Sequence, residues 1–295
     1  MKVTIDPGSG FCFGVKRAIE HAESILKDQE QLYCLGDIVH NKAEMNRLRE
    51  RGLVSIDHEA VKNLKEKHLL FRAHGEPPAS YRLTKGNNIS LTDATCPIVS
   101  RLQDKITKAF EKIKENNGQL VIFGNPDHPE TIGLQGQTGG MAIIINDPGR
   151  LDKIDPARPV ELFSQTTKST EGFLQLEKNI RKLMSEHFPE MELPLKVHNT
   201  ICGQISRRTP GIGKFAASHE VIIFVGGVDS SNAKVLFQKC KESNPNSWFI
   251  STPEELKAEW FRNAGSAGVC GATSTPQWLM EKVSEKIMKL TEGKN

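Results

Sequence analysis

Short apolar runs alternate with longer amphipathic stretches along the whole chain. The short runs predict strands at 31–35, 68–72, 89–92, 119–123, 142–145, 160–163, 196–198, 221–225, 248–250 and 268–269. The longer stretches carry apolar residues at helical spacing and predict helices at 15–27, 42–50, 99–115, 171–186, 233–241 and 276–290. Strands that alternate with helices in this way predict an α/β fold, in which crossover helices join parallel strands.

The predicted strands fall into about three groups of similar size, although the chain has no clean sequence repeat. A length of 295 residues is typical of more than one hydrophobic core. We therefore expect three small α/β domains, at residues 1–96, 97–193 and 194–295, rather than one large sheet. The expected linkers lie near Cys96-Pro97 and Glu192-Leu193-Pro194.

Composition narrows the class of protein. Apolar residues make up 37% of the chain, which is enough for ordinary globular cores. The formal net charge of +3 comes from 39 basic and 36 acidic residues, a balance that argues against a dedicated nucleic-acid binder. No apolar run approaches the roughly 18 residues that a membrane span needs, and the first residues lack the apolar segment of a secretory signal. We expect a cytoplasmic protein without membrane partners.

Three cysteines lie beside Gly or Pro at the ends of apolar runs: Cys12, Cys96 and Cys202. They do not form the close pairs of structural zinc sites or of common ferredoxin motifs. Three isolated thiolates can hold a metal or an iron–sulfur cluster that keeps one position open for a reacting ligand. Three unrelated buried thiols are the alternative, since free Cys is usually buried.

The other three cysteines have different settings. Cys34 lies inside an apolar run and Cys240 in the middle of a predicted helix, so both are expected to be core residues. Cys270 adjoins glycine near the last predicted strand, and its role stays open between core and site.

Polar side chains follow many of the predicted strands. His40, His74 and His128 occupy three such positions, and ligands of open α/β sheets bind at the carboxyl ends of strands. An imidazole there suits phosphate oxygens or proton transfer, whereas a surface or helix-capping histidine is the alternative for each one alone.

Glu130 and Thr166 are two further polar residues that come shortly after predicted strands. A carboxyl group in a closed pocket has a raised pKa and can donate a proton, but a glutamate in the first turn of a helix is also favoured by the helix dipole. Thr166 fits a hydroxyl relay or an ordinary helix N-cap.

The segment Ser230-Ser231-Asn232 opens one predicted helix, and Ser274 opens the last one. Helix N-termini with such side chains bind anions, although simple N-capping explains them as well. The glycine patterns of Walker and Rossmann nucleotide sites are missing from the sequence. The chain thus looks equipped for a phosphate but not for a classical nucleotide site.

These motifs follow one another in a specific order: Gly10-Phe11-Cys12-Phe13-Gly14, Val39-His40-Asn41, Ala73-His74-Gly75, Asp93-Ala94-Thr95-Cys96-Pro97, His128-Pro129-Glu130, Gln165-Thr166-Thr167, Thr200-Ile201-Cys202 and Ser230-Ser231-Asn232. Together they resemble the IspH or LytB family of 4-hydroxy-3-methylbut-2-enyl diphosphate reductases, from about residue 3 to residue 290.

The resemblance implies three α/β domains around a pseudo-threefold axis, with a [4Fe–4S] cluster at the centre. It implies cluster ligands at Cys12, Cys96 and Cys202. It implies a catalytic group of Glu130 as proton donor, Thr166 as its relay, and His128. It implies substrate-binding residues at His40, His74, His128, Thr166, Ser230, Ser231, Asn232 and Ser274, most of them around the diphosphate. In that family the C4 hydroxyl oxygen of the substrate binds the iron that no cysteine holds.

The implied reaction is a two-electron, two-proton reductive dehydroxylation. It yields isopentenyl diphosphate and dimethylallyl diphosphate at the end of the methylerythritol phosphate pathway, with an electron donor such as ferredoxin or flavodoxin. One departure is that many members read Thr-Ala-Gly-Ala-Ser-Thr-Pro where this chain reads Cys270-Gly271-Ala272-Thr273-Ser274-Thr275-Pro276. Ser274 still aligns, so the phosphate contact is expected to survive.

Two other functions stay open at this level. Quinolinate synthase shares the pseudo-threefold design and a three-cysteine cluster, although the His128-Pro129-Glu130 and Ser230-Ser231-Asn232 motifs argue against it. A non-catalytic iron–sulfur sensor is the other alternative. The sequence does not give the product ratio, the natural electron donor or the oligomeric state.

Overall fold

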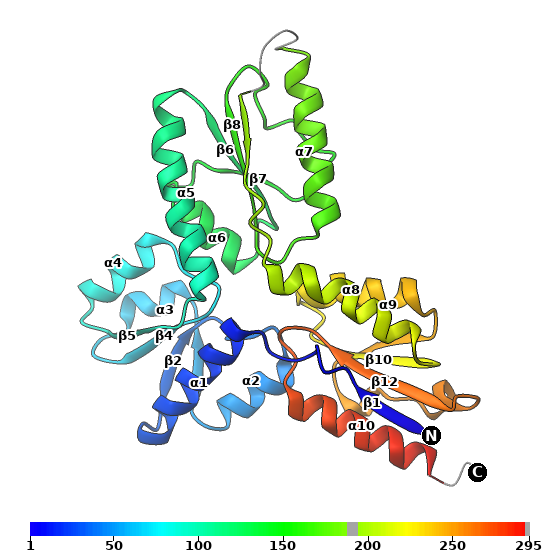
Figure 1. The fold of residues 1–295 in the computed structure, drawn as a ribbon. Helices are drawn as coiled ribbons and strands as arrows, with labels where there is room; N and C mark the ends of the chain where they lie inside the picture. The colour runs from blue at the N-terminus through cyan, green and yellow to red at the C-terminus, as the bar shows by residue number, and fades with distance from the viewer. Residues whose placement is uncertain (188–193, 293–295) are drawn as a thin grey trace. The chain divides into compact units, whose positions relative to one another are not determined.

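The computed structural model describes residues 1–187 and 194–292, in which strands and helices alternate along the chain (Figure 1). The expected linker at 192–193 lies outside the described residues. The strands form three four-stranded sheets. Pairing is parallel throughout sheets A and C and between β4 and β5 of sheet B. The predicted α/β fold with parallel sheets is confirmed.

Each sheet has a simple strand order. Sheet A runs β1 (Lys2–Ile5), β12 (Ser266–Gly271), β10 (Val221–Val225), β11 (Ser247–Ile250). Sheet B runs β3 (Leu53–Ile56), β2 (Leu32–Leu35), β4 (His68–Phe71), β5 (Ser90–Asp93). Sheet C runs β7 (Ile143–Ile145), β6 (Gln119–Phe123), β8 (Val160–Ser164), β9 (Leu195–Val197).

Every predicted strand and helix is present, within two residues of each predicted end. The predicted helices correspond to α1 (Phe13–Asp28), α2 (Lys42–Arg49), α5 (Pro97–Glu115), α7 (Thr170–Ser185), α9 (Ser231–Ser243) and α10 (Gln277–Thr291). The elements that the pattern missed are β1, β3, α3 (His58–Asn63), α4 (Pro78–Gly86), α6 (Pro129–Gly136), α8 (Gly203–Ala217) and two short 3₁₀ turns, Pro253–Glu255 and Ala258–Phe261. Most of these are short, and α8 contains Pro210 and several glycines, which are poor helix formers.

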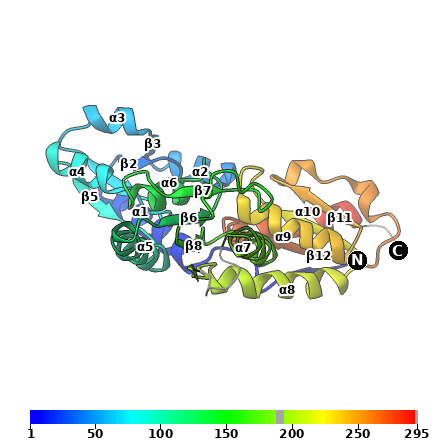
Figure 2. The same cartoon turned by 90° about the horizontal axis from the view of Figure 1, so that it is seen from above.

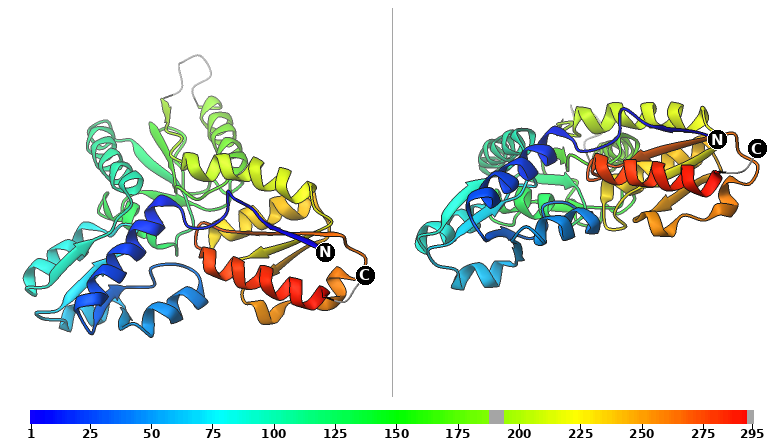
Figure 3. Two further views of the ribbon diagram at one scale, coloured as in Figure 1. Left: turned by 60° about the horizontal axis from the view of Figure 1, so that its bottom comes forward. Right: turned by 90° about the horizontal axis from the view of Figure 1, so that it is seen from below.

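The chain forms two compact units, which are described separately below. The first consists of residues 1–55 with 203–295, and the second of residues 56–202. The first strand, β1, pairs with β12 (Lys2 with Ser266), so the start of the chain contributes to the sheet of the C-terminal part (Figure 3). The division into three domains stays a prediction.

In the second unit, helices cover both faces of sheet C (Figure 1). One face packs against α7 through Phe173, Leu176 and Ile180. The other packs against α5 and α6, with Ile106 and Leu134 buried among them. Strands covered on both sides must be apolar on both sides, which explains the continuous apolar run Leu120–Phe123 of β6.

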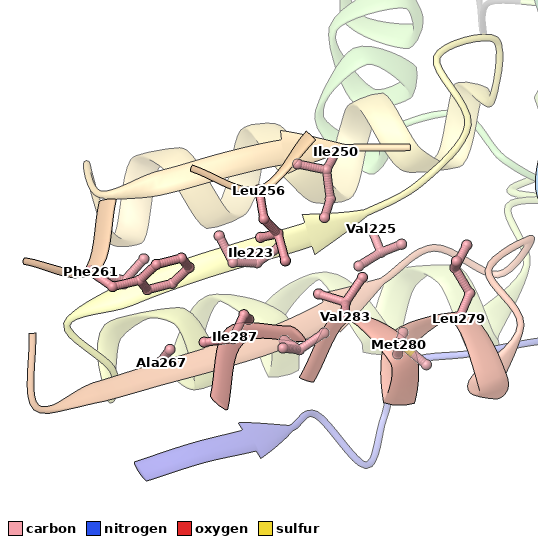
Figure 4. Packing of buried hydrophobic residues seen from close by; sticks show 12 residues of the cluster. Ile223, Val225, Ile250, Leu256, Phe261, Ala267, Leu279, Met280, Val283 and Ile287 are labelled. Carbon is pink, nitrogen blue, oxygen red and sulfur yellow. The ribbon is translucent and has the colours of Figure 1, made fainter. Parts of the chain in front are cut away.

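In the first unit, α10 covers one face of sheet A with Leu279, Met280, Val283 and Ile287, an apolar stripe at helical spacing (Figure 4). Helices α8 and α9 lie next to each other on the opposite face (Figure 2). Both faces of this sheet are therefore dry, and polar side chains concentrate where its strands end.

Parallel register brings the ends of neighbouring strands to one edge. In sheet A, Val225 at the end of β10 pairs with Gly271 at the end of β12. In sheet C, Phe123 at the end of β6 pairs with Ser164 at the end of β8. The loops that follow these strands carry most of the side chains predicted to bind or react. Among the described helices, none is both long and apolar enough to cross a membrane.

Candidate active site

Glu130 is a buried acid at the start of α6, directly after β6. Its side chain is only 2% exposed. One carboxylate oxygen, Oε1, accepts the backbone N–H of Thr166 at 2.7 Å, and the other, Oε2, accepts the Thr166 hydroxyl at 2.7 Å. Burial raises the pKa of Glu130 to about 7, although both hydrogen bonds from Thr166 pull that pKa down. At neutral pH the carboxyl group therefore exchanges readily between its acid and base forms.

The loop that carries Thr166 is fixed by Gln165, which is fully buried. The Gln165 side-chain oxygen accepts the backbone N–H of Asn125 at 3.1 Å and the Thr131 hydroxyl at 3.2 Å. These bonds join the loop after β8 to the loop after β6 and to α6. Sequence reasoning gave Gln165 no role of its own, and its place beside Thr166 in the motif was the only available signal.

His128 is the N-cap of α6, and its Nδ1 accepts the backbone N–H of Glu130 at 3.2 Å. A neutral His128 therefore carries its proton on Nε2. Its ring stands edge-on to the ring of His74, with the centroids 5.3 Å apart. The structure thus brings together two histidines, one from the loop after β4 and one from the loop after β6. Through His128, this pair adjoins Glu130.

Cys96 and Cys202 are the predicted ligands in the second unit. Cys96 is the N-cap of α5 and donates its backbone N–H to Ala73 at 3.0 Å. Cys202 immediately precedes α8 and donates its backbone N–H to the Thr166 carbonyl at 2.9 Å. Thr166 therefore contacts both the buried acid and the backbone of a candidate ligand.

Cys12 lies in the first unit as the N-cap of α1, and its backbone N–H points at the Thr273 carbonyl at 3.4 Å. Burial lowers the pKa of Arg208 of α8, and the nearby charges of Cys12 and Asp6 offset part of this lowering. The Arg208 Nη1 is buried and has no hydrogen-bond partner within residues 1–187 and 194–292. A permanent cation near Cys12 favours the thiolate form of that cysteine.

The two groups of cysteines have different environments. Cys12, Cys96 and Cys202 are partly exposed, and each lies at the N-terminal end of a helix. Cys34, Cys240 and Cys270 are fully buried, as predicted for the first two. Helix N-termini stabilise thiolates, and thiolates are the usual protein ligands of iron–sulfur clusters. By donor chemistry, the three partly exposed cysteines fit such a cluster.

Cys270 belongs to the core. Its sulfur lies 3.8 Å from that of Cys240, among the apolar residues between sheet A and helices α8 and α9. Burial raises the pKa of the Cys270 thiol well above its usual value. The structure therefore gives Cys270 the surroundings of a packing residue.

Ser230, Asn232 and Ser274 gather at the carboxyl edge of sheet A in the first unit. Ser230 caps α9 by accepting the backbone N–H of Ala233 at 3.2 Å, and the Ser274 hydroxyl lies 3.4 Å from the Ser230 hydroxyl. All three side chains are nearly or fully buried, and Ser231, the first residue of α9, is half-buried beside them. This is a dense set of hydroxyl and amide groups at a helix N-terminus, a setting that favours an anion.

Only one of the two polar atoms of the Asn232 side-chain amide has a hydrogen-bond partner among the described residues. Its Nδ2 donates to the Thr273 hydroxyl at 2.8 Å, whereas its Oδ1 is buried with no partner in the described part of the chain. When the amide is turned over, the Thr273 hydroxyl donates to Oδ1 and the free N–H groups of Nδ2 face an acceptor instead. The open end of this side chain can therefore meet an anionic oxygen.

His40 and Asn41 lie between β2 and α2 in the same unit. A Cβ on Gly227 would fall 1.8 Å from the His40 carbonyl oxygen, so only glycine allows the loop after β10 to approach this closely. Asn41 caps α2 by accepting the backbone N–H of Glu44 at 3.1 Å. The predicted pocket residues His40 and Ser230–Asn232 therefore lie on adjoining loops.

Each unit holds its own part of the predicted set. The first holds Cys12, His40, Ser230, Ser231, Asn232 and Ser274; the second holds His74, Cys96, His128, Glu130, Thr166 and Cys202.

Comparison with known proteins gives a consistent result. The family model described as "LytB protein" matches residues 3–288. The 4-hydroxy-3-methylbut-2-enyl diphosphate reductases of Parabacteroides distasonis and Porphyromonas gingivalis are each 49% identical to this chain over 290 residues, which is 98% of the chain and 98% and 99% of those proteins.

Two solved structures are also similar. One, described as (E)-4-hydroxy-3-methyl-but-2-enyl diphosphate reductase, the terminal enzyme of the non-mevalonate pathway, is 33% identical, with a TM-score of 0.71 over 98% of this chain and all of that one. The other, the E-1-hydroxy-2-methyl-but-2-enyl-4-diphosphate reductase of Plasmodium falciparum, is 26% identical, with a TM-score of 0.81 over 97% and 88%.

Proposed function

Because the chain belongs to the LytB protein family, we propose that it reduces 4-hydroxy-3-methylbut-2-enyl diphosphate to isopentenyl and dimethylallyl diphosphates. The full-length similarity to named reductases supports this reaction over a quinolinate-synthase-like dehydration or a non-catalytic sensor. Within the molecule, the observation that carries the proposal is the buried Glu130 with both oxygens bonded to Thr166.

The first unit supplies the binding groups for the diphosphate. Ser230, Ser231, Asn232 and Ser274 offer hydroxyl and amide donors at the N-terminus of α9, and His40 offers an imidazole from the adjoining loop. Helix N-termini favour negative charge, so these donors bind an anion without a cluster of lysines or arginines. His74 and His128 of the second unit are proposed as further contacts of the substrate's polar end.

Glu130 supplies the proton for the departing hydroxyl group. A carboxyl group with a pKa of about 7 still holds a proton in a large fraction of molecules at neutral pH. In that form its O–H can donate to the Thr166 hydroxyl, which is 2.7 Å away and can rotate to pass a proton on. The pair therefore acts as an acid with a relay, and His128 holds the start of α6 through the Glu130 backbone N–H.

Cys12, Cys96 and Cys202 are proposed to hold a [4Fe–4S] cluster. When bound, the cluster supplies electrons one at a time and a Lewis-acidic iron for the substrate's hydroxyl oxygen, which no side chain in the protein can do. The proposal includes an external one-electron donor such as ferredoxin or flavodoxin. It also includes a reducing cytoplasmic setting, where cysteines serve more often as metal ligands or thiols than as disulfides.

Product analysis tests the function and the acid together. Anaerobic protein loaded with iron and sulfide, given a chemical electron donor and the allylic diphosphate, is expected to form both isoprenoid diphosphates. Glu130→Gln is expected to lower kcat by about 10²- to 10⁴-fold, the usual range for loss of a general acid. Glu161→Gln is the matched control, because Glu161 is also a buried carboxylate of this unit but is bonded to His198.

The outcomes separate the alternatives. Turnover to the isoprenoid products with normal rates in Glu161→Gln and low rates in Glu130→Gln supports the proposal. Unchanged rates in Glu130→Gln remove the acid assignment. A loaded protein that binds the substrate without any turnover indicates a sensor. Mössbauer spectra of the loaded protein are expected to contain one distinct iron site that responds to substrate.

A further inference from the structure

A buried polar junction joins α2 to α10 in the first unit, and neither helix has been given a role in the reaction so far. Glu44 of α2 is fully buried, which is rare for a carboxylate. Its Oε2 accepts the Trp278 indole N–H at 2.8 Å and the Arg47 Nε at 2.9 Å, and its Oε1 accepts the Arg47 Nη2. Arg47 also donates to Glu23 of α1 at 2.7 Å.

The residues of this junction lie close in sequence to two residues of the proposed diphosphate pocket. Glu44 lies four residues after His40, in the first turn of α2, and the Asn41 side chain accepts the Glu44 backbone N–H. Trp278 lies four residues after Ser274, in the first turn of α10. The contact therefore connects the starts of two helices, each of which directly follows a residue of the proposed diphosphate pocket.

The two helices also have apolar anchors of their own. Helix α10 is fixed to sheet A by Leu279 and Met280, whereas α2 buries Met45 and Leu48. Among the residues of α2, only Ala43 packs against the sheet A core in the part of the chain that the structure describes. The polar junction is thus a second link between the loop of His40 and the turn of Ser274. The first is the loop after β10, which approaches the His40 carbonyl oxygen at Gly227 and the Ser274 hydroxyl at Ser230.

A buried carboxylate with hydrogen bonds to both oxygens has a fixed geometry, because each lost partner leaves a charge that is poorly solvated. Resting on the function proposed above, we propose that Glu44, Arg47 and Trp278 are positioning residues for the diphosphate: they hold His40 and Ser274 at the spacing that the anion requires. They act on binding, since the proton-donating pair Glu130 and Thr166 belongs to the other unit.

The test compares Trp278→Phe, Glu44→Gln and the double variant in the anaerobic, cluster-loaded protein. Trp278→Phe removes the N–H donor, keeps a smaller aromatic ring against the sheet A core, and leaves Glu44 paired with Arg47. Trp248→Phe is the matched control, because Trp248 stacks on Trp260 at the surface of the same unit, with ring centroids 4.7 Å apart. Calorimetry with inorganic pyrophosphate gives Kd, and turnover of the allylic diphosphate gives KM and kcat.

Trp278→Phe is expected to raise Kd and KM about fivefold, because only part of the free energy of the lost Trp278–Glu44 hydrogen bond is transmitted to binding, with kcat within about twofold of wild type. Glu44→Gln is expected to raise both about tenfold. In the double variant, Kd and KM are expected to be no higher than in Glu44→Gln alone, because both substitutions disrupt the same junction. Trp248→Phe is expected to match wild type.

Wild-type Kd and KM in Trp278→Phe and Glu44→Gln would overturn the proposal, and so would a fall in kcat alone. If Glu44→Gln does not fold, as judged by circular dichroism, Trp278→Phe decides. A wild-type protein that binds pyrophosphate but forms no isoprenoid product would remove the proposed function, while the pyrophosphate Kd values would still test the junction.

Discussion

Ser230, Asn232 and Ser274 in one compact unit are neutral donors, whereas Glu130 in the other unit is a buried carboxyl group that changes charge near pH 7. The neutral donors sit at a helix N-terminus and can favour an anion at any physiological pH. The carboxyl group is shielded from water, and burial is the largest cause of its raised pKa. If the proposed roles hold, substitutions in one unit change diphosphate binding and substitutions in the other change proton donation.

The largest expected effect concerns the cysteines rather than either polar group. Cys96→Ala is expected to abolish reductase activity and most of the bound iron, since a partly exposed thiol at a helix N-terminus is the kind of ligand a cluster needs. Iron and sulfide analysis with the visible absorption spectrum provides the measurement.

Cys34→Ala, treated in the same way, is the control, because Cys34 is fully buried. Full iron content in Cys96→Ala would show that the partly exposed cysteines are not the ligand set.

The pH dependence of kcat tests the role of Glu130 as the proton donor. Glu130 donates a proton only while protonated, so kcat is expected to fall as the pH rises through about 7, by about tenfold per pH unit above it. Because the hydrogen bond from the Thr166 hydroxyl lowers this pKa, Thr166→Val, which removes that bond and keeps the backbone one, is expected to move the midpoint to higher pH while it lowers kcat. Stopped-flow or steady-state rates between pH 6 and about 9 are sufficient.

Glu130→Gln has no such ionisation, and its low residual rate is expected to stay flat over the same range. A midpoint near pH 7 that persists in Glu130→Gln would assign the ionisation to another group.

At the binding unit the expected effect is smaller. Ser274→Ala is expected to raise KM for the diphosphate about tenfold, because it removes one donor to a charged oxygen, and to leave kcat and its pH midpoint unchanged. Ser284→Ala, a buried serine of α10 in the same unit, is the control. A shifted pH midpoint in Ser274→Ala would break the separation between the two units.

The smallest expected effect is that of Cys270→Ala. Loss of a buried sulfur that packs against Cys240 is expected to lower the free energy of unfolding by about 1 kcal/mol, with iron content and kcat unchanged. Urea denaturation of the apoprotein measures the first quantity. Loss of iron comparable to that in Cys96→Ala would move Cys270 from the core to the site.

Much of the fold could be predicted because its strands are buried on both sides. Runs such as Val221–Val225 read as strands without any knowledge of their neighbours. Strand β1 could not be recognised in this way, since it has four residues, includes Lys2 and Thr4, and depends on a partner more than 260 residues away. Helix α8 was missed because local propensity argues against Pro210 in a helix that tertiary packing nevertheless supports.

The set of site residues could be predicted because the order of the motifs resembles that of a known family. The sequence could not decide between the alternative roles of single residues. A first-turn glutamate and a buried acid look the same at Glu130 until its 2% exposure and its bonds to Thr166 are known. The role of Gln165 likewise depends on partners in another loop, Asn125 and Thr131. Such bonds are set by strand register, which the pattern of one sequence does not contain.

The pairing of β1 with β12 also has a consequence for the order in which the protein is made. All strands of sheet C lie within residues 119–197, so they can pair while the ribosome is still adding the remainder of the chain. Sheet A needs residues 2–5 and 266–271 together, and its first strand must wait for its last. Ser274 lies three residues after β12, so the proposed diphosphate pocket can be completed only after sheet C has been synthesised.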